Sequence, residues 1–160
     1  MNDSKPSSRS LHAYAFDQDP DGFTRDDMLP ADGILDIFLT AVLGYKDTDA
    51  SVGITVSIGG ALVSGTAIPR GRWQQLWFDS MRAAAPGLTT ALEPHFDRQL
   101  DATAEVYDRR DKAGLPIPAL KHLHLRDVTM WNTSQQVHLP IWRARLDRLD
   151  GWSIGTLGPS

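Results

Sequence analysis

Apolar and polar positions alternate with a period of two in the segment VGITVSIGGALVSGTAI, which lies within residues 51–68. Ile54 points to one face of an extended chain and Thr55 to the other, as in a strand with one buried side. Gly59-Gly60 then supplies the two positive φ angles of a tight primed turn. The pattern therefore predicts a β-hairpin over residues 51–68.

A helical period precedes this hairpin. Residues 31–45 place apolar side chains at helical spacing, with Asp32 available as the N-cap and Gly44 close to the end. This stretch is apolar on nearly all sides, so the predicted helix must be covered by more than one neighbour. A barrel mouth or a second copy of the chain would provide such a cover.

A second helical region, residues 72–113, follows the hairpin and is read as a helical insertion. Trp73 and Trp77 are four residues apart, so they share a helix face and are candidates for the core. Further along, Thr90 and Glu93 have the spacing of a capping box. The insertion thus predicts one or two helices.

The closing segment, residues 120–157, returns to the strand pattern. Leu125 and Val128 are both apolar but stand on opposite parities, which requires a one-residue bulge near Asp127. Asp150-Gly151 further on is typical of a two-residue hairpin turn. We therefore expect strongly bent strands that end in a final hairpin.

These elements predict an α+β fold. The expected architecture is a small, strongly bent antiparallel β-barrel (Sm/SH3-like) of about five strands, with an N-terminal helix and a helical insertion. Residues 31–157 form one domain in this interpretation. Residues 1–30 are rich in Ser, Pro, Asp and Gly and show no period, so we expect them to form a flexible N-terminal arm.

Composition narrows the possible functions. The 160 residues include 16 basic and 20 acidic side chains, giving a net charge of −4, which argues against a nucleic acid or an anionic membrane as the main partner. Cysteine is absent, which excludes disulfides, thiolate zinc sites and a cysteine nucleophile. No segment has the apolar length of a signal peptide core or a membrane span, so we expect a cytoplasmic protein.

Histidines are the first candidates for chemistry. His122 and His124 lie two residues apart on a predicted strand, with His138 downstream, and a carboxylate such as Asp127 would complete a zinc or iron site. The simpler interpretation places both histidines on the wet face of the strand, because no metalloprotease-like motif accompanies them. We therefore assign no metal, no cofactor and no catalytic residue, and a His-based metal-dependent enzyme remains an alternative.

Arginine and tryptophan gather near the end of the chain, at Arg143, Arg145, Arg148, Trp142 and Trp152. Such a set suits single-stranded nucleic acid, where bases stack on rings and phosphates pair with arginines. It also suits a protein interface, which favours the same residue types as anchors. Neighbouring aspartates and the acidic total favour the protein interface.

Three segments in order resemble the gas vesicle accessory protein U family. They are ITVSIGGALVSGTAI (54–68), LKHLHLRDVTMW (120–131) and PIWRARLDRLDGWSIGTL (140–157). The resemblance covers roughly residues 31–157. It implies a small cytoplasmic protein that is not an enzyme, that binds gas vesicle shell or accessory proteins, and that influences how vesicles assemble or cluster.

Two further expectations accompany this resemblance. The apolar leading helix predicts self-association, because no broad side of it suits exposure to water. The helix and glycine-turn hairpin are also similar in topology to Sm-like RNA-binding rings, although topology alone does not carry function. An Sm-like RNA-binding oligomer is therefore the second alternative.

Overall fold

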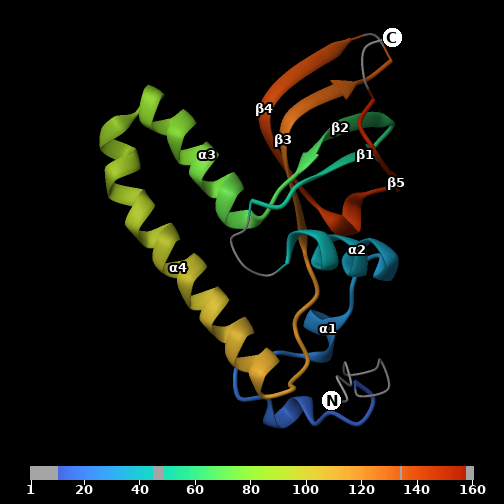
Figure 1. The fold of residues 1–160 in the computed structure, drawn as a ribbon, viewed down its shortest axis with the longest axis vertical. Helices are drawn as coiled ribbons and strands as arrows, with labels where there is room; N and C mark the ends of the chain where they lie inside the picture. The colour runs from blue at the N-terminus through green and yellow to red at the C-terminus, as the bar shows by residue number, and fades with distance from the viewer. Residues whose placement is uncertain (1–10, 45–48, 134, 158–160) are drawn as a thin grey trace.

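The computed structural model describes residues 11–44, 49–133 and 135–157, and it has an α+β fold (Figure 1). It contains a five-stranded antiparallel sheet. Two α-helices precede the first two strands in the sequence, and two α-helices follow them. In chain order the elements are η2 (Phe16–Gln18), α1 (Arg25–Met28), α2 (Gly33–Leu43), β1 (Val52–Ile58), β2 (Ala61–Ala67), α3 (Arg70–Ala84), α4 (Pro86–Lys112), β3 (His122–Trp131), β4 (Gln136–Arg145), η3 (Leu146–Arg148) and β5 (Gly151–Ile154). The described residues include no helix of the length and apolarity needed to cross a membrane.

The strand order is β4-β3-β2-β1-β5, so the last strand returns to pair with the first. The predicted final hairpin at Asp150-Gly151 is therefore wrong. Asp150 instead accepts a hydrogen bond of 2.8 Å from the Gly59 N–H, and its own N–H donates to the Ser57 carbonyl oxygen. The sheet is open, with β4 and β5 at its edges, so a closed Sm/SH3-like barrel is not confirmed.

The hairpin of β1 and β2 is confirmed, and so is its turn. Gly59 and Gly60 have φ angles of 54° and 82°, which glycine adopts without the steric cost of a Cβ. The side of β1 that the alternation marks as polar is also covered. The Thr55 hydroxyl donates to the Gly155 carbonyl oxygen and shares a second hydrogen bond with the Ser64 hydroxyl.

The predicted bulge lies at Asp127. Its φ of 52° is the one positive value among the described residues other than glycine, and the pairing of β2 with β3 shifts by one residue beside it. The bulge lets Leu125 and Val128 both point into the core, although one is at an odd and the other at an even position of the strand. Gly65 faces it, where a Cβ would come within 3.0 Å of the Arg126 carbonyl oxygen, so glycine permits this close approach.

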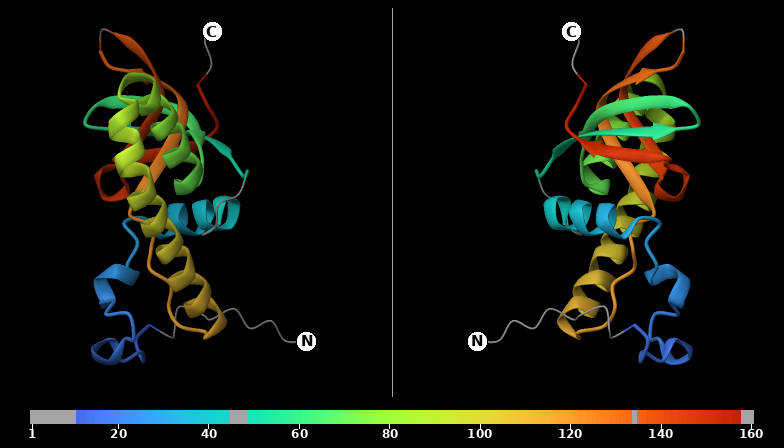
Figure 2. Two further views of the ribbon diagram at one scale, coloured as in Figure 1. Left: turned by 90° about the vertical axis from the view of Figure 1, so that its left-hand side faces the viewer. Right: turned by 90° about the vertical axis from the view of Figure 1, so that its right-hand side faces the viewer.

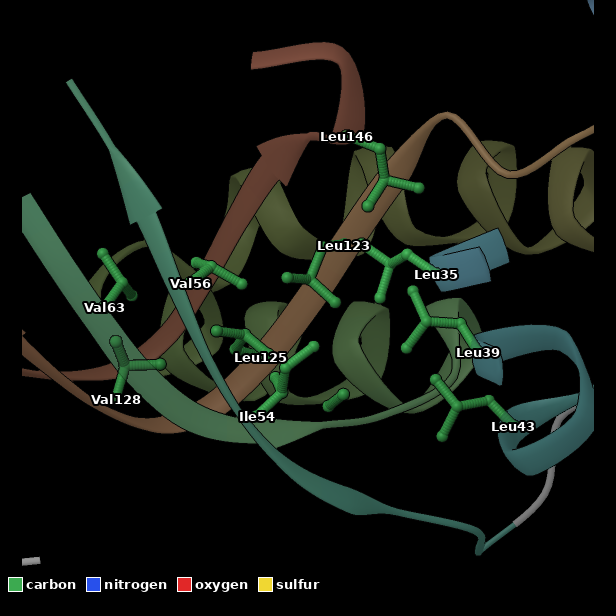
Figure 3. Packing of buried hydrophobic residues seen from close by; sticks show 11 residues of the cluster. Leu35, Leu39, Leu43, Ile54, Val56, Val63, Leu123, Leu125, Val128 and Leu146 are labelled. Atoms are coloured by element: carbon green, nitrogen blue, oxygen red, sulfur yellow. The ribbon is translucent and has the colours of Figure 1, made fainter. Parts of the chain in front are cut away.

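The core lies between the sheet and α2 (Figure 3). Asp32 caps α2 by accepting hydrogen bonds of 2.9 Å from the N–H groups of Ile34 and Leu35, as the sequence predicts. The side chains that α2 directs at the sheet are Leu35, Leu39 and Leu43. The opposite side of α2 is exposed, so the residues that the structure describes cover only one side of this apolar helix.

Helices α3 and α4 form a hairpin beside the sheet, and α4 extends well beyond the ends of the strands (Figure 2). Pro86 occupies the first turn of α4, where a missing N–H costs nothing, so the helix starts earlier than Thr90. The predicted capping box is wrong, because Thr90 donates to the Pro86 carbonyl oxygen and Glu93 pairs with Arg82 at 2.8 Å.

Residues 11–30, the described part of the expected flexible arm, pack beside the C-terminal end of α4 (Figures 1 and 2). The cause is Arg110, whose side chain is 0% exposed and would be a buried lone charge without carboxylates. Asp19 and Asp21 supply them at 2.8–3.0 Å. The first ten residues of the predicted arm lie outside the described residues.

Candidate interaction groove

A groove of about 580 Å³ opens between the helical hairpin and the end of the sheet. In Figure 1, α3 and α4 stand on one side of it, and α2 with the start of β3 stands on the other. Residues of α2, α3, α4 and β3 line the groove together. Its volume is in the range of pockets that hold small molecules or several side chains.

Aromatic side chains form the helical wall of the groove. Trp73 and Trp77 stack with ring centroids 6.0 Å apart, and Trp77 lies 5.4 Å from Phe96 of α4. Both tryptophans are half-buried and line the groove, so the prediction that they belong to the core is wrong. Phe78 and Gln74 are the α3 side chains that are buried.

Two histidines of β3 face this wall. His122 and His124 are two residues apart and therefore point to the same side, with their ring centroids 6.3 Å apart, and His124 lies 5.3 Å from the Trp73 ring. His124 is only 9% exposed, so the expected wet face is covered at this position by α3. Burial, followed by the nearby Arg143, lowers the pKa of His124 to about 3, so its ring is neutral at pH 7.

Permanent cations outnumber acids around the groove. Arg70, Lys121 and Arg143 line it, against the single carboxylate of Asp101. Burial and the proximity of Arg70 lower the pKa of Arg143, as expected for two like charges near each other. The described lining of the groove is therefore richer in basic than in acidic side chains, although the whole chain is acidic.

The five interaction residues proposed from the sequence do not form one surface. Arg143 lines the groove, whereas Trp142 packs against the core, and Arg145 pairs with Asp147 outside the groove. Arg148 is exposed in η3. Trp152 lies on β5, where it stacks on Phe38 at 6.1 Å and donates a hydrogen bond of 3.0 Å to Asp32.

The sequence interpretation missed the groove residues on α3 and α4. The available signal was the tryptophan pair at positions 73 and 77 together with Leu100 and Tyr107, which repeat at helical spacing on the following helix. This pattern showed that two apolar helix faces exist. The pattern did not show that these helix faces are only partly covered, because the extent of cover depends on the angle at which the α3–α4 hairpin packs on the sheet.

Over residues 11–44, 49–133 and 135–157, no group of three or more His, Cys, Asp or Glu side chains could hold a metal ion. What the groove offers chemically is an apolar, aromatic surface edged by positive charge. Such a surface suits recognition of an anionic group that carries an apolar body.

Comparison with known proteins adds one match. A family described as gas vesicle protein GvpU-like matches residues 32–157, which include every strand and helices α2 to α4. The comparison with curated proteins and the comparison with solved structures found no match.

Proposed function

This chain belongs to the GvpU-like family of gas vesicle proteins, and we propose that it is a non-catalytic accessory protein that binds the vesicle shell or another accessory protein. Through this binding it influences vesicle assembly or clustering. The observation that carries the proposal is the family match over residues 32–157, since these residues contain the whole sheet and the groove.

The groove supports binding more than catalysis. Neither His122 nor His124 has a side-chain hydrogen bond to a carboxylate among the residues that the structure describes, so this part of the groove contains no His–carboxylate pair. An Arg- and Trp-lined surface is instead typical of anchors in protein interfaces.

Flotation tests this function. Gas vesicles are buoyant, so purified protein that binds them should rise with intact vesicles during centrifugation, and vesicle clustering should increase the scattered light. Vesicles stripped of associated proteins with urea provide the second arm. Binding to stripped vesicles assigns the shell as the partner, and binding to unstripped vesicles alone assigns an accessory protein. Protein that stays below both kinds of vesicle would contradict the proposal.

We also propose that the exposed side of α2 mediates self-association. Ile34 and Ile37 are 73% and 69% exposed and lie one turn apart, which is unusual for isoleucines on a helix in water. Sedimentation should give a mass above 17.7 kDa for the wild type and the monomer mass for Ile34→Lys/Ile37→Lys. A monomeric wild type at tens of micromolar would disprove self-association.

A further inference from the structure

Two arginines of the groove lack a counter-charge. Arg70 begins α3, and Arg143 lies on β4 opposite His124. Within the described part of the chain, neither guanidinium has an ion pair or a hydrogen bond to an acceptor. Other arginines of the chain form ion pairs with carboxylates, as is usual for this side chain; these are Arg82, Arg110 and Arg145. The two groove arginines are therefore available to an acceptor from outside the chain.

A buried donor on one of the residues that line the groove also lacks an acceptor. The Trp73 Nε1–H is buried and has no hydrogen-bond partner in the described structure. Buried polar groups are normally paired, and one that is not often marks the place of a missing partner. Three residues that line the groove thus carry donors with no acceptor in the described structure, the two arginines at its surface and Trp73 with a buried N–H. Lys121 is excluded from this group because it donates to the Asp26 and Leu29 carbonyl oxygens.

The other residues that line the groove indicate which chemical group the occupant should carry beside its hydrogen-bond acceptor. Trp77, Leu100 and Ala104 present apolar surface next to these donors. A free inorganic anion would leave this surface exposed to water. An occupant with one or two carboxylates beside an apolar side chain would satisfy both parts of the groove.

We propose that this groove docks an acidic segment of a gas vesicle protein, with its carboxylates on Arg70 and Arg143 and a neighbouring apolar side chain between α3 and α4. The inference rests on the proposed function and names the chemistry of its partner. Nucleic acid fits less well, because the chain has a net charge of −4 and Asp101 stands at the groove.

Charge reversal in the groove tests the proposal by flotation with intact vesicles. The full-length variant Arg70→Glu/Arg143→Glu should bind at least about tenfold more weakly than the wild type. The matched control is Lys112→Glu/Arg148→Glu, which makes the same charge change at exposed residues that do not line the groove and should bind within about twofold of the wild type. Circular dichroism checks that each variant is folded.

A second variant and a treatment of the vesicles keep the test independent of the charge reversal. Ala104→Trp leaves both arginines in place but fills the groove, and it should weaken binding by a similar factor. Amidation of the vesicle carboxylates with carbodiimide and ethanolamine should weaken binding of the wild type, because it removes the charge that the arginines recognise.

The outcomes separate this inference from the proposed function. The inference is overturned if the groove variants bind vesicles as well as the wild type does and if amidation leaves wild-type binding unchanged. The proposed function would remain intact in that case. Failure of the wild type to bind any vesicles would overturn both. Displacement of the wild type from vesicles by a 20-nucleotide oligo(dT) at 0.15 M salt would overturn the acidic protein segment in favour of nucleic acid.

Discussion

Arg110→Met should lower the free energy of unfolding by about 3 kcal/mol, because it leaves a carboxylate buried without its cation. Arg110 donates to both carboxylate oxygens of Asp19, at 2.8 and 3.0 Å, and neither side chain is exposed. It also donates to the Pro116 carbonyl oxygen at 2.7 Å and lies over the Phe23 ring. Urea unfolding measures the loss, and amide exchange at Phe23 reports whether residues 11–30 open first.

Arg109→Met is the matched control for this prediction. Arg109 is the next residue on α4 and also pairs with Asp21, but its side chain is 59% exposed. Exposed ion pairs contribute little, so the control should change stability by less than about 1 kcal/mol. Equal stability of the two variants and the wild type would contradict the structural role assigned to Arg110.

The dependence of stability on pH gives a second check of the same cluster. The hydrogen bonds from Arg110 hold the pKa of Asp19 well below its usual value. The stabilisation is therefore complete above the pKa of an unfolded aspartate, about 3.9, and is lost as the pH falls from there toward the lower folded pKa. Unfolding in acid should show this loss in the wild type, and the loss should be smaller in Arg110→Met.

Local patterns in the sequence predict much of the sheet. Gly59-Gly60 fixes a turn within a few residues, and the parity change between Leu125 and Val128 forces the bulge at Asp127. The Asp32 cap of α2 likewise involves only neighbouring N–H groups. In each case the residues that make the interaction are close in the chain, so the sequence pattern contains the answer.

Contacts between distant residues explain the incorrect predictions. Asp150 and Gly151 have the sequence of a turn, but Asp150 bonds to Gly59, 91 residues away, and this contact accompanies the pairing of β5 with β1. Residues 11–30 show no apolar period, yet they contact the domain through Arg110, which is distant in sequence. Neither partner can be identified without the fold, because many aspartates and arginines would serve equally well.

The residues of the candidate groove likewise include some that the sequence identified and others that depend on the fold. Arg143 was identified from its residue type and its neighbours, and the structure places it in the groove. Trp73 and Trp77 were correctly assigned to one helix face, but the uncovered part of that face results from the angle between the helical hairpin and the sheet. A tryptophan pair at helical spacing is compatible with a core and with a binding wall, so periodicity alone does not separate them.

A photo-crosslink from the groove tests the central claim most directly, because it asks whether a vesicle protein enters this space. Gln99 and Gln75 are both exposed glutamines of the helical hairpin, but only Gln99 lines the groove. Each is replaced in turn by a benzophenone amino acid in the full chain, which is then irradiated with intact gas vesicles. Mass spectrometry identifies the protein and the peptide in each adduct.

We expect an adduct from position 99 with an acidic segment of one vesicle protein, and little or none from position 75. Adding Arg70→Glu/Arg143→Glu to the position 99 variant should remove this adduct. Equal adducts from both positions, or an adduct from position 75 alone, would contradict the claim that the groove receives the partner.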